Sequence, residues 1–239
     1  MLNFNHHHRG FTLLEGIIAM AVITIGLVAG ITLTVVNISS AQNNERRIVA
    51  ANLAREGIEA IRNMRDSNWL KVNLNESYTT TGGGTKLYTW NSWLTTDASG
   101  VKTPVPNAFT ITYLPAATSG SNPEYNLIDN VIGEGCGRQD YMCGCYEHNK
   151  TSCAVTYDSA TQLYGTASGN PSSYYRIITL QDICYQDSSN SEVIVIPEEG
   201  CDTGNNYFPV GVVVTSQVRY PAGQSTQDVI ARERLYNWR

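Results

Sequence analysis

The chain has 239 residues, a formal net charge of −5 and only 15% charged residues. This length has room for one medium-sized domain together with a membrane or targeting segment. The low charged content favours an extracytoplasmic protein of strands and turns over a charged cytosolic helix bundle. The negative net charge argues against a general nucleic-acid binder, which would carry a basic surface. Nucleic acid is therefore not an expected partner.

The first predicted element is a helix that begins near Thr12. Its run from Gly16 to Val36 contains no charged residue, and at about 1.5 Å per residue this run matches a bilayer core of about 30 Å. Glu15 stands directly before the run, where a charge is costly unless it has a partner. A cleaved signal peptide would have a shorter apolar core followed by its cleavage site. An uncleaved anchor fits the length but gives no reason for Glu15.

The helix is predicted to continue as an amphipathic segment to about Met64, because small or apolar residues recur there at steps of three or four. Arg55, Glu59 and Arg62 occupy the opposite side at spacings that allow ion pairs. We therefore assign residues 11–36 to a membrane-spanning helix and residues 37–66 to its amphipathic second half. The recurring positions are Ile48, Ala51, Ala54, Ile58, Ile61 and Met64.

Residues 67–239 are predicted to form an extracytoplasmic, β-rich domain. Gly82, Gly83 and Gly84 mark a flexible loop near its start. The last two predicted strands form an antiparallel hairpin, and a turn-rich, cysteine-rich insertion covers about residues 115–173. Six runs have strand character, at residues 86–90, 109–114, 174–181, 192–196, 210–220 and 228–238. In the hairpin, one face is expected to carry Val212, Val214, Val218 and Tyr220.

The cysteines predict disulfide bonds and an oxidising compartment, which places the body outside the cytoplasm and the N-terminus inside it. The six residues are Cys136, Cys143, Cys145, Cys153, Cys184 and Cys201. Six cysteines allow 15 pairings; we expect Cys184 to pair with Cys201 and the other four to pair within the insertion. Zinc binding by this region, with His148 as a ligand, is the weaker alternative because no C-x2-C pair is present.

Residues 9–15, Arg-Gly-Phe-Thr-Leu-Leu-Glu followed by an apolar helix, resemble the prepilin leader and N-terminal segment of the type IV pilin family. The resemblance covers about residues 1–68, and residues 54–69 and 234–239 are similar to minor pilins. It implies that residues 1–10 are a leader, which a membrane prepilin peptidase removes by cutting after Gly10 before methylating the amine of Phe11. It also implies that Glu15 pairs with the amine of a neighbouring subunit and guides assembly.

The resemblance further implies a single-pass membrane protein that contacts lipid before assembly. Pilus assembly machinery in the inner or cytoplasmic membrane would then add it, through its N-terminal helix, to other pilin subunits in a cell-surface filament. Pilins often carry a helix-breaking proline in this segment. Here there is none between Phe11 and Thr103, although Gly26 and Gly30 offer a milder weak point.

We therefore predict a pilin-like α+β fold, in which a long N-terminal helix with a membrane-spanning first half packs on an antiparallel sheet with a cysteine-rich loop insertion. The predicted function is that of a structural subunit, a minor pilin of a type IV pilus or related filament, with no enzymatic activity and no cofactor. One alternative is a pseudopilin of a type II secretion system. Another is a helix-anchored adhesin or DNA-binding module.

Three further sets of residues are candidate sites. Acids in the distal loops suggest calcium, but without a D-x-D-x-D-G pattern we interpret them as solvated; they are Asp182, Asp187, Glu198, Glu199 and Asp202. Aromatic residues suggest an adhesive surface, although packing is the preferred interpretation; they include Tyr174, Tyr175, Tyr207 and Phe208. Arg232, Arg234 and Arg239 suggest DNA, but they alternate with apolar residues as on a half-exposed strand.

Overall fold

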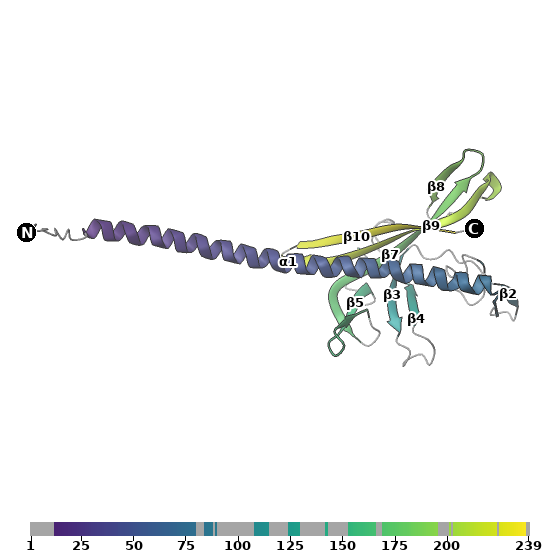
Figure 1. The fold of residues 1–239 in the computed structure, drawn as a ribbon, viewed down its shortest axis with the longest axis horizontal. Helices are drawn as coiled ribbons and strands as arrows, with labels where there is room; N and C mark the ends of the chain where they lie inside the picture. Colours follow the sequence, from purple (N-terminus) through teal and green to yellow (C-terminus); the bar gives the residue numbers. More distant parts are fainter. Residues whose placement is uncertain are drawn as a thin grey trace, which may run out of the picture. The chain divides into compact units, whose positions relative to one another are not determined.

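The computed structural model describes residues 12–79, 84–87, 89, 108–114, 124–129, 142, 153–165, 169–195, 201, 203–223 and 225–237. The chain divides into two units, Met1–Glu45 and Arg46–Arg239. Helix α1 (Leu13–Asn73) begins in the first unit and ends in the second (Figure 1). The other elements are β1 (Ser77–Thr79), β2 (Thr85–Leu87), β3 (Ala108–Leu114), β4 (Glu124–Asp129), β5 (Ala154–Asp158), β6 (Leu163–Tyr164), β7 (Asn170–Gln186), β8 (Ser191–Val195), the short 3-10 helix η3 (Thr203–Asn205), β9 (Tyr207–Ala222) and β10 (Ser225–Tyr236).

The described part of the first unit is a helix without a core of its own. Every side chain from Thr12 to Gln42 is exposed, and the helix is long and apolar enough in this region to cross a membrane. The hydroxyl groups of Thr24, Thr32 and Thr34 donate to main-chain carbonyls three or four residues earlier, at 2.8–2.9 Å. These polar groups are therefore satisfied within the helix, as an apolar surrounding requires.

Helix α1 ends nine residues beyond the end predicted at Met64. Asn75 adopts a left-handed conformation with φ 52°, and the Glu76 amide donates to the Lys71 carbonyl at 3.0 Å while the Asn75 amide donates to Val72 at 3.1 Å. This is the Schellman arrangement, with asparagine in the position that glycine usually occupies. The predicted end followed the polar residues from Asp66 onward, but Asn68 is buried and its side chain donates to the Thr89 carbonyl at 2.8 Å, which keeps this turn helical.

The body contains an antiparallel sheet with the strand order β10-β9-β7-β3-β4, while β5 and β8 also pair with β7 and β6 pairs with β5. Strands β9 and β10 form the predicted hairpin, with Val212 opposite Leu235 and Val218 opposite Val229. The prediction of a long helix on an antiparallel sheet is confirmed. The insertion is less loop-like than predicted, because β4, β5 and β6 lie within residues 115–173; these short strands show only brief alternation of apolar and polar residues.

The core of the second unit forms where α1 packs on β7, β9 and β10. Ile58 and Ile61 of the helix meet Ile178, Leu180, Val212, Val214 and Leu235 of the strands. Nearer the start of the unit, Leu53 and Ala54 pack with Tyr174, Val218 and Tyr220. All four residues predicted to share a face of the hairpin are buried. Ile48 was predicted on the packed stripe and is 62% exposed, because the buried stripe instead begins at Ala50.

Gly57 marks the closest approach of α1 to the sheet. A Cβ atom built there would lie 2.5 Å from Oγ of Ser216 and 3.0 Å from Cδ1 of Ile178. Alanine favours a helix over glycine by about 1 kcal/mol, but the helix would have to move away from a packed sheet, and overpacking costs about 1–3 kcal/mol. For alanine at position 57, the cost of overpacking is therefore expected to exceed the gain in helix propensity.

We expect Gly57→Ala to lower the thermal unfolding temperature of the full-length protein by several degrees, measured by circular dichroism. Ser216→Ala is the control, because Oγ of Ser216 is buried without a hydrogen-bond partner in the described structure, so its removal is expected to be neutral or stabilising. The double variant should recover part of the loss, since the two positions are in contact. An unchanged or raised unfolding temperature for Gly57→Ala alone would contradict this account.

Candidate functional site

The start of α1 brings Glu15, which the sequence singled out, together with Thr12. Thr12 caps the helix, because its Oγ1 accepts a hydrogen bond from the Glu15 amide at 3.4 Å and its carbonyl accepts from the amides of Glu15 and Gly16 at 3.0 and 3.2 Å. Glu15 thus occupies the third helical position, where a carboxylate interacts favourably with the positive end of the helix dipole. Sequence reasoning missed the role of Thr12, although the T-x-x-E spacing is typical of a capping box.

Glu15 stands at the head of the exposed apolar helix rather than inside a packed environment. The leucines at positions 13 and 14 and the isoleucines at 17 and 18 are exposed around it. The predicted processing residues Gly10 and Phe11 lie outside the described residues. The structure therefore supplies the geometry of Glu15 and the start of the helix, but not that of the cleavage site.

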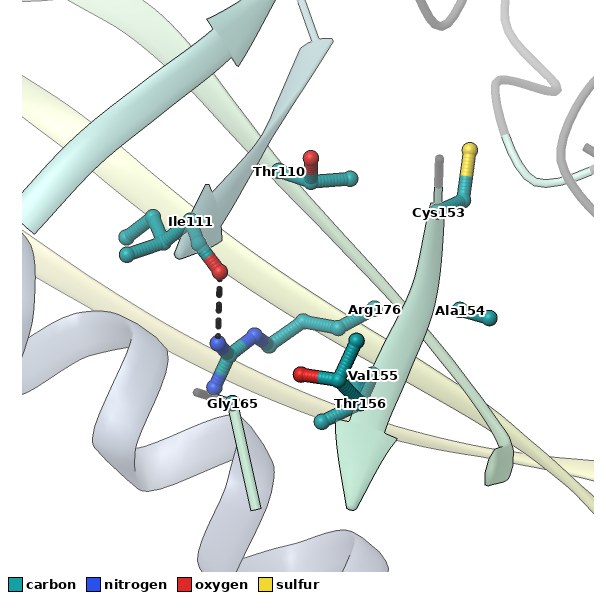
Figure 2. Close-up of a pocket in the computed structure, with 8 residues that line it drawn as sticks. All are labelled: Thr110, Ile111, Cys153, Ala154, Val155, Thr156, Gly165 and Arg176. Atoms are coloured by element: carbon teal, nitrogen blue, oxygen red, sulfur yellow. Dashed lines mark hydrogen bonds between the residues drawn. The ribbon is translucent and has the colours of Figure 1, made fainter. Parts of the chain in front are cut away.

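A second polar feature is Arg176 of β7, which is 3% exposed. Its Nη1 donates to the Leu53 carbonyl at 3.2 Å and to Oε2 of Glu56 at 3.1 Å. Its Nη2 donates to the Ile111 carbonyl at 3.1 Å, the hydrogen bond drawn in Figure 2. One guanidinium therefore joins α1, β3 and β7. No local sequence signal pointed to this role, because the helical and strand partners lie 65 to 123 residues away.

Arg176 also lines a small pocket together with residues from β3 and β5. Its volume is about 20 Å³, and its described lining comprises Thr110, Ile111, Cys153, Ala154, Val155, Thr156, Gly165 and Arg176 (Figure 2). A cavity of this size holds roughly one water molecule, whereas small-molecule sites usually measure about 300–1,000 Å³. The guanidinium is therefore used for packing the helix on the sheet, and the pocket is too small for an organic substrate.

Comparison with known protein families decides between the anchor and the prepilin interpretations of the N-terminus. Residues 5–31 match the family described as "Prokaryotic N-terminal methylation motif". The chain carries the N-terminal methylation motif of type IV pilins and pseudopilins. No curated protein and no solved structure matches the chain. The motif, the long apolar helix and the antiparallel sheet together describe a pilin- or pseudopilin-like structural subunit, and they do not indicate an enzyme.

In this pilin-like subunit a disulfide bond closes the segment that contains β8 into a loop. A disulfide joins Cys184 of β7 to Cys201, with the Cα atoms 5.6 Å apart, and these are the two residues paired from the sequence. Closing a loop of this size, with a separation of 17 residues, stabilises a fold by about 3 kcal/mol in the chain-entropy view. Cys153 is also disulfide-bonded, which excludes it as a thiolate ligand for zinc. Cys136, Cys143, Cys145 and His148 lie outside the described residues.

Strand β8 and the adjoining ends of β7 and β9 form an arm of the sheet (Figure 1). The disulfide lies within this arm, because Cys184 pairs with Val193 of β8 and with Pro209 of β9. A carboxylate fastens this arm to the C-terminal strand, because Oε2 of Glu192 accepts a hydrogen bond from the hydroxyl of Tyr236 at 3.0 Å. Arg234 lies 3.5 Å from the same oxygen. Strand β10 therefore stabilises an element that is not its neighbour in the sheet.

The remaining candidate residues differ in their surroundings where they are described. Tyr174 is buried and packs against Tyr220, with ring centroids 6.3 Å apart, as the packing interpretation predicted. Phe208 differs, with 48% of its surface exposed. Among the described residues, no group of three or more acids, histidines or cysteines could hold a metal ion. Glu198, Glu199, Asp202 and Arg239 are outside the described part of the chain.

The arginines of β10, and Arg219 of β9, make polar contacts with side chains of other strands. Nε of Arg232 donates to the Thr215 hydroxyl at 3.1 Å, and Arg234 pairs with Glu192. Arg219 forms two hydrogen bonds with Asp228, at 2.7 and 2.8 Å, and these lower the pKa of the Asp228 carboxyl. Because the folded-state pKa is depressed, this pair stabilises the fold at neutral pH and loses that effect as the pH falls through the folded-state pKa.

Proposed function

We propose that the chain is a minor pilin of a type IV pilus or related filament. It is made as a precursor that prepilin peptidase cleaves after Gly10 and methylates on Phe11. Before assembly its N-terminus is cytoplasmic, its apolar helix lies in the membrane and its body is extracytoplasmic; afterwards it is part of a cell-surface filament. The observation that carries this proposal is the methylation motif at residues 5–31, which coincides with the start of an exposed apolar helix.

The size and construction of the body favour a specialised subunit. Beyond α1 the chain adds a sheet with a disulfide-closed arm and further disulfide-bonded sequence at Cys153. The oxidised cysteines support the proposed extracytoplasmic location of this part, since cytosolic thiols are kept reduced. A body of this kind can present its own surface on the filament, which is the property expected of a minor subunit.

In this proposal Glu15 acts only after cleavage. Removal of residues 1–10 creates an amine at Phe11, four residues before Glu15 in the same chain. A carboxylate at the head of an apolar helix gains from a cationic partner in a membrane or filament core. We propose that Glu15 pairs with the Phe11 amine of a neighbouring subunit and so sets the axial register of assembly.

The direct test is the intact mass and N-terminal sequence of the protein isolated from its own cells. We expect a mature chain that begins at methylated Phe11 and lacks residues 1–10. An N-terminus at Met1, or cleavage beyond Val36, would overturn the proposal. Deletion of the genes for pilus assembly, compared with deletion of the genes for type II secretion, then separates a pilin from a pseudopilin by showing which deletion keeps the matured subunit in the membrane.

A further inference from the structure

A tripeptide with a modification pattern follows the end of α1. Residues 75–77, Asn-Glu-Ser, have the form N-x-S/T, which is the acceptor sequence for attachment of a glycan to asparagine. All three residues are exposed. Because the pattern is short, its surroundings in the fold decide whether it can be used.

The same pattern occurs at residues 37–39, Asn-Ile-Ser, and at residues 149–151, Asn-Lys-Thr. The first lies inside helix α1, and the second lies outside the described residues. A transferase needs an accessible loop or turn, where the asparagine side chain and the hydroxyl two residues later can face its active site together. Helical residues two apart do not face the same way. Among the described residues, only 75–77 meet this requirement.

The turn that carries Asn75 is held by its main chain. The Asn75 amide donates to the Val72 carbonyl at 3.1 Å, and the Glu76 amide donates to the Lys71 carbonyl at 3.0 Å. Asn75 has φ 52°, a conformation that glycine and asparagine tolerate best. Its side chain is exposed and takes no part in these two bonds. Modification of Nδ2 would therefore leave the end of the helix intact.

Three exposed leucines surround the tripeptide and form what we call the leucine patch: Leu70, Leu74 and Leu87, with 62–69% of their surface exposed. Leu74 lies one helical turn after Leu70, to whose carbonyl its amide donates at 3.0 Å. Leu87 of β2, which lies at the end of α1 (Figure 1), is opposite Ser77 of β1, so these two side chains share a face. Apolar side chains that gather on a surface mark a contact site.

We propose that Asn75 is glycosylated and that the glycan covers the leucine patch. The donor is a glycan carried on a polyprenyl diphosphate in the membrane. Nδ2 of Asn75 attacks C1 of the first sugar, the bond from C1 to the diphosphate oxygen breaks, and one amide proton passes to a base of the transferase. The polyprenyl diphosphate is the leaving group. Sugar rings present C–H groups that pack on leucine, while their hydroxyl groups stay in water.

This inference rests on the proposed function, because the transfer requires the body to be extracytoplasmic. The test is mass spectrometry of the full-length protein from its own cells. Trypsin cuts after Lys71 and Lys86, and the resulting peptide 72–86 contains no other N-x-S/T sequence. We expect this peptide to be heavier by at least one sugar, with fragmentation placing the sugar on Asn75.

Two variants should lose the whole mass shift by different routes. Asn75→Gly removes the acceptor and keeps a residue suited to the left-handed turn, and Ser77→Ala removes the hydroxyl of the pattern. Ser77→Thr is the matched control and should keep the glycan, as should Asn37→Gln.

Hydroxyl-radical labelling then measures the cover over the patch. Leu70 and Leu74 should be labelled roughly twofold more in Asn75→Gly than in Ser77→Thr. Leu163 is exposed outside the patch and should be labelled equally in both variants.

An unmodified peptide 72–86 would overturn the inference, as would a sugar placed on a serine or threonine of that peptide. Equal labelling of the leucine patch in the two variants would overturn the covering role. The proposed function fails separately: a chain that keeps Met1 but carries the glycan on Asn75 retains the modification and removes the pilin assignment. A chain that begins at Phe11 with unmodified Asn75 does the reverse.

Discussion

Glu15→Ala is expected to leave cleavage after Gly10 intact and to reduce incorporation into filaments at least tenfold. The reason is the proposed pairing of Glu15 with the Phe11 amine of a neighbouring subunit. A charge at the centre of a membrane helix costs about 2.5–3.5 kcal/mol, and a free energy of about 1.4 kcal/mol corresponds to a factor of ten. Because Glu15 lies at the head of the helix rather than its centre, its cost is below this range, and the expected tenfold effect requires only about 1.4 kcal/mol. Sheared filament fractions, probed with an antibody to the body, measure the effect.

Two controls separate charge pairing from changes in the helix itself. Glu15→Gln keeps the shape and removes the charge, so it should fail like alanine. Glu45→Ala removes an exposed acid from the same helix outside the apolar run and should assemble normally. Normal filament content of Glu15→Ala would show that the pairing role is wrong, even if the mature N-terminus is Phe11.

Arg176→Leu is expected to destabilise the body by about 3 kcal/mol, the lower end of the cost of breaking a buried ion pair. The variant leaves the carbonyls of Leu53 and Ile111 without this donor and removes the partner of Glu56. Glu56 is 35% exposed, so water can compensate part of its loss. For a body of this size the change corresponds to a fall of roughly 6–12 °C in unfolding temperature, measured on full-length protein in detergent.

Arg234→Leu is the matched control, since Arg234 is 54% exposed and its ion pair with Glu192 spans 3.5 Å. Exposed pairs of this kind contribute about 0–1 kcal/mol. A loss for Arg176→Leu no larger than that for Arg234→Leu would contradict the role assigned to the buried guanidinium. Arg176→Lys should recover little, because one ammonium cannot reach three acceptors placed around a planar fork.

Sequence reasoning worked where a signal is local. The apolar run and the residues from Gly10 to Glu15 predicted the helix and the motif that comparison later matched. The alternation in β9 and β10 predicted their hairpin and its buried face. The end of α1 was missed, because asparagine at position 75 takes the left-handed conformation that is usually assigned to glycine.

What escaped prediction depends on residues that are distant in the sequence. In the sequence Arg176 is a single charged residue within an apolar strand. Its hydrogen bonds to the carbonyls of Leu53 and Ile111 form only when the chain has folded. Strands β5 and β6 are five and two residues long. They are too short for the alternation of apolar and polar residues to be recognised. Their pairing with β7 and with each other, rather than their own propensity, makes them strands.

Arg46 and Arg62 of α1 contact the last two strands, which are synthesised much later than the helix. Arg46 bonds to Pro221, 175 residues later, and Arg62 to Glu233, 171 residues later. The apolar stripe of the helix thus emerges from the ribosome long before β9 and β10, which must cover it. Such distant pairing slows folding and leaves that stripe exposed in the meantime. A nascent chain that stops before β9 would therefore be a target for chaperones or proteases.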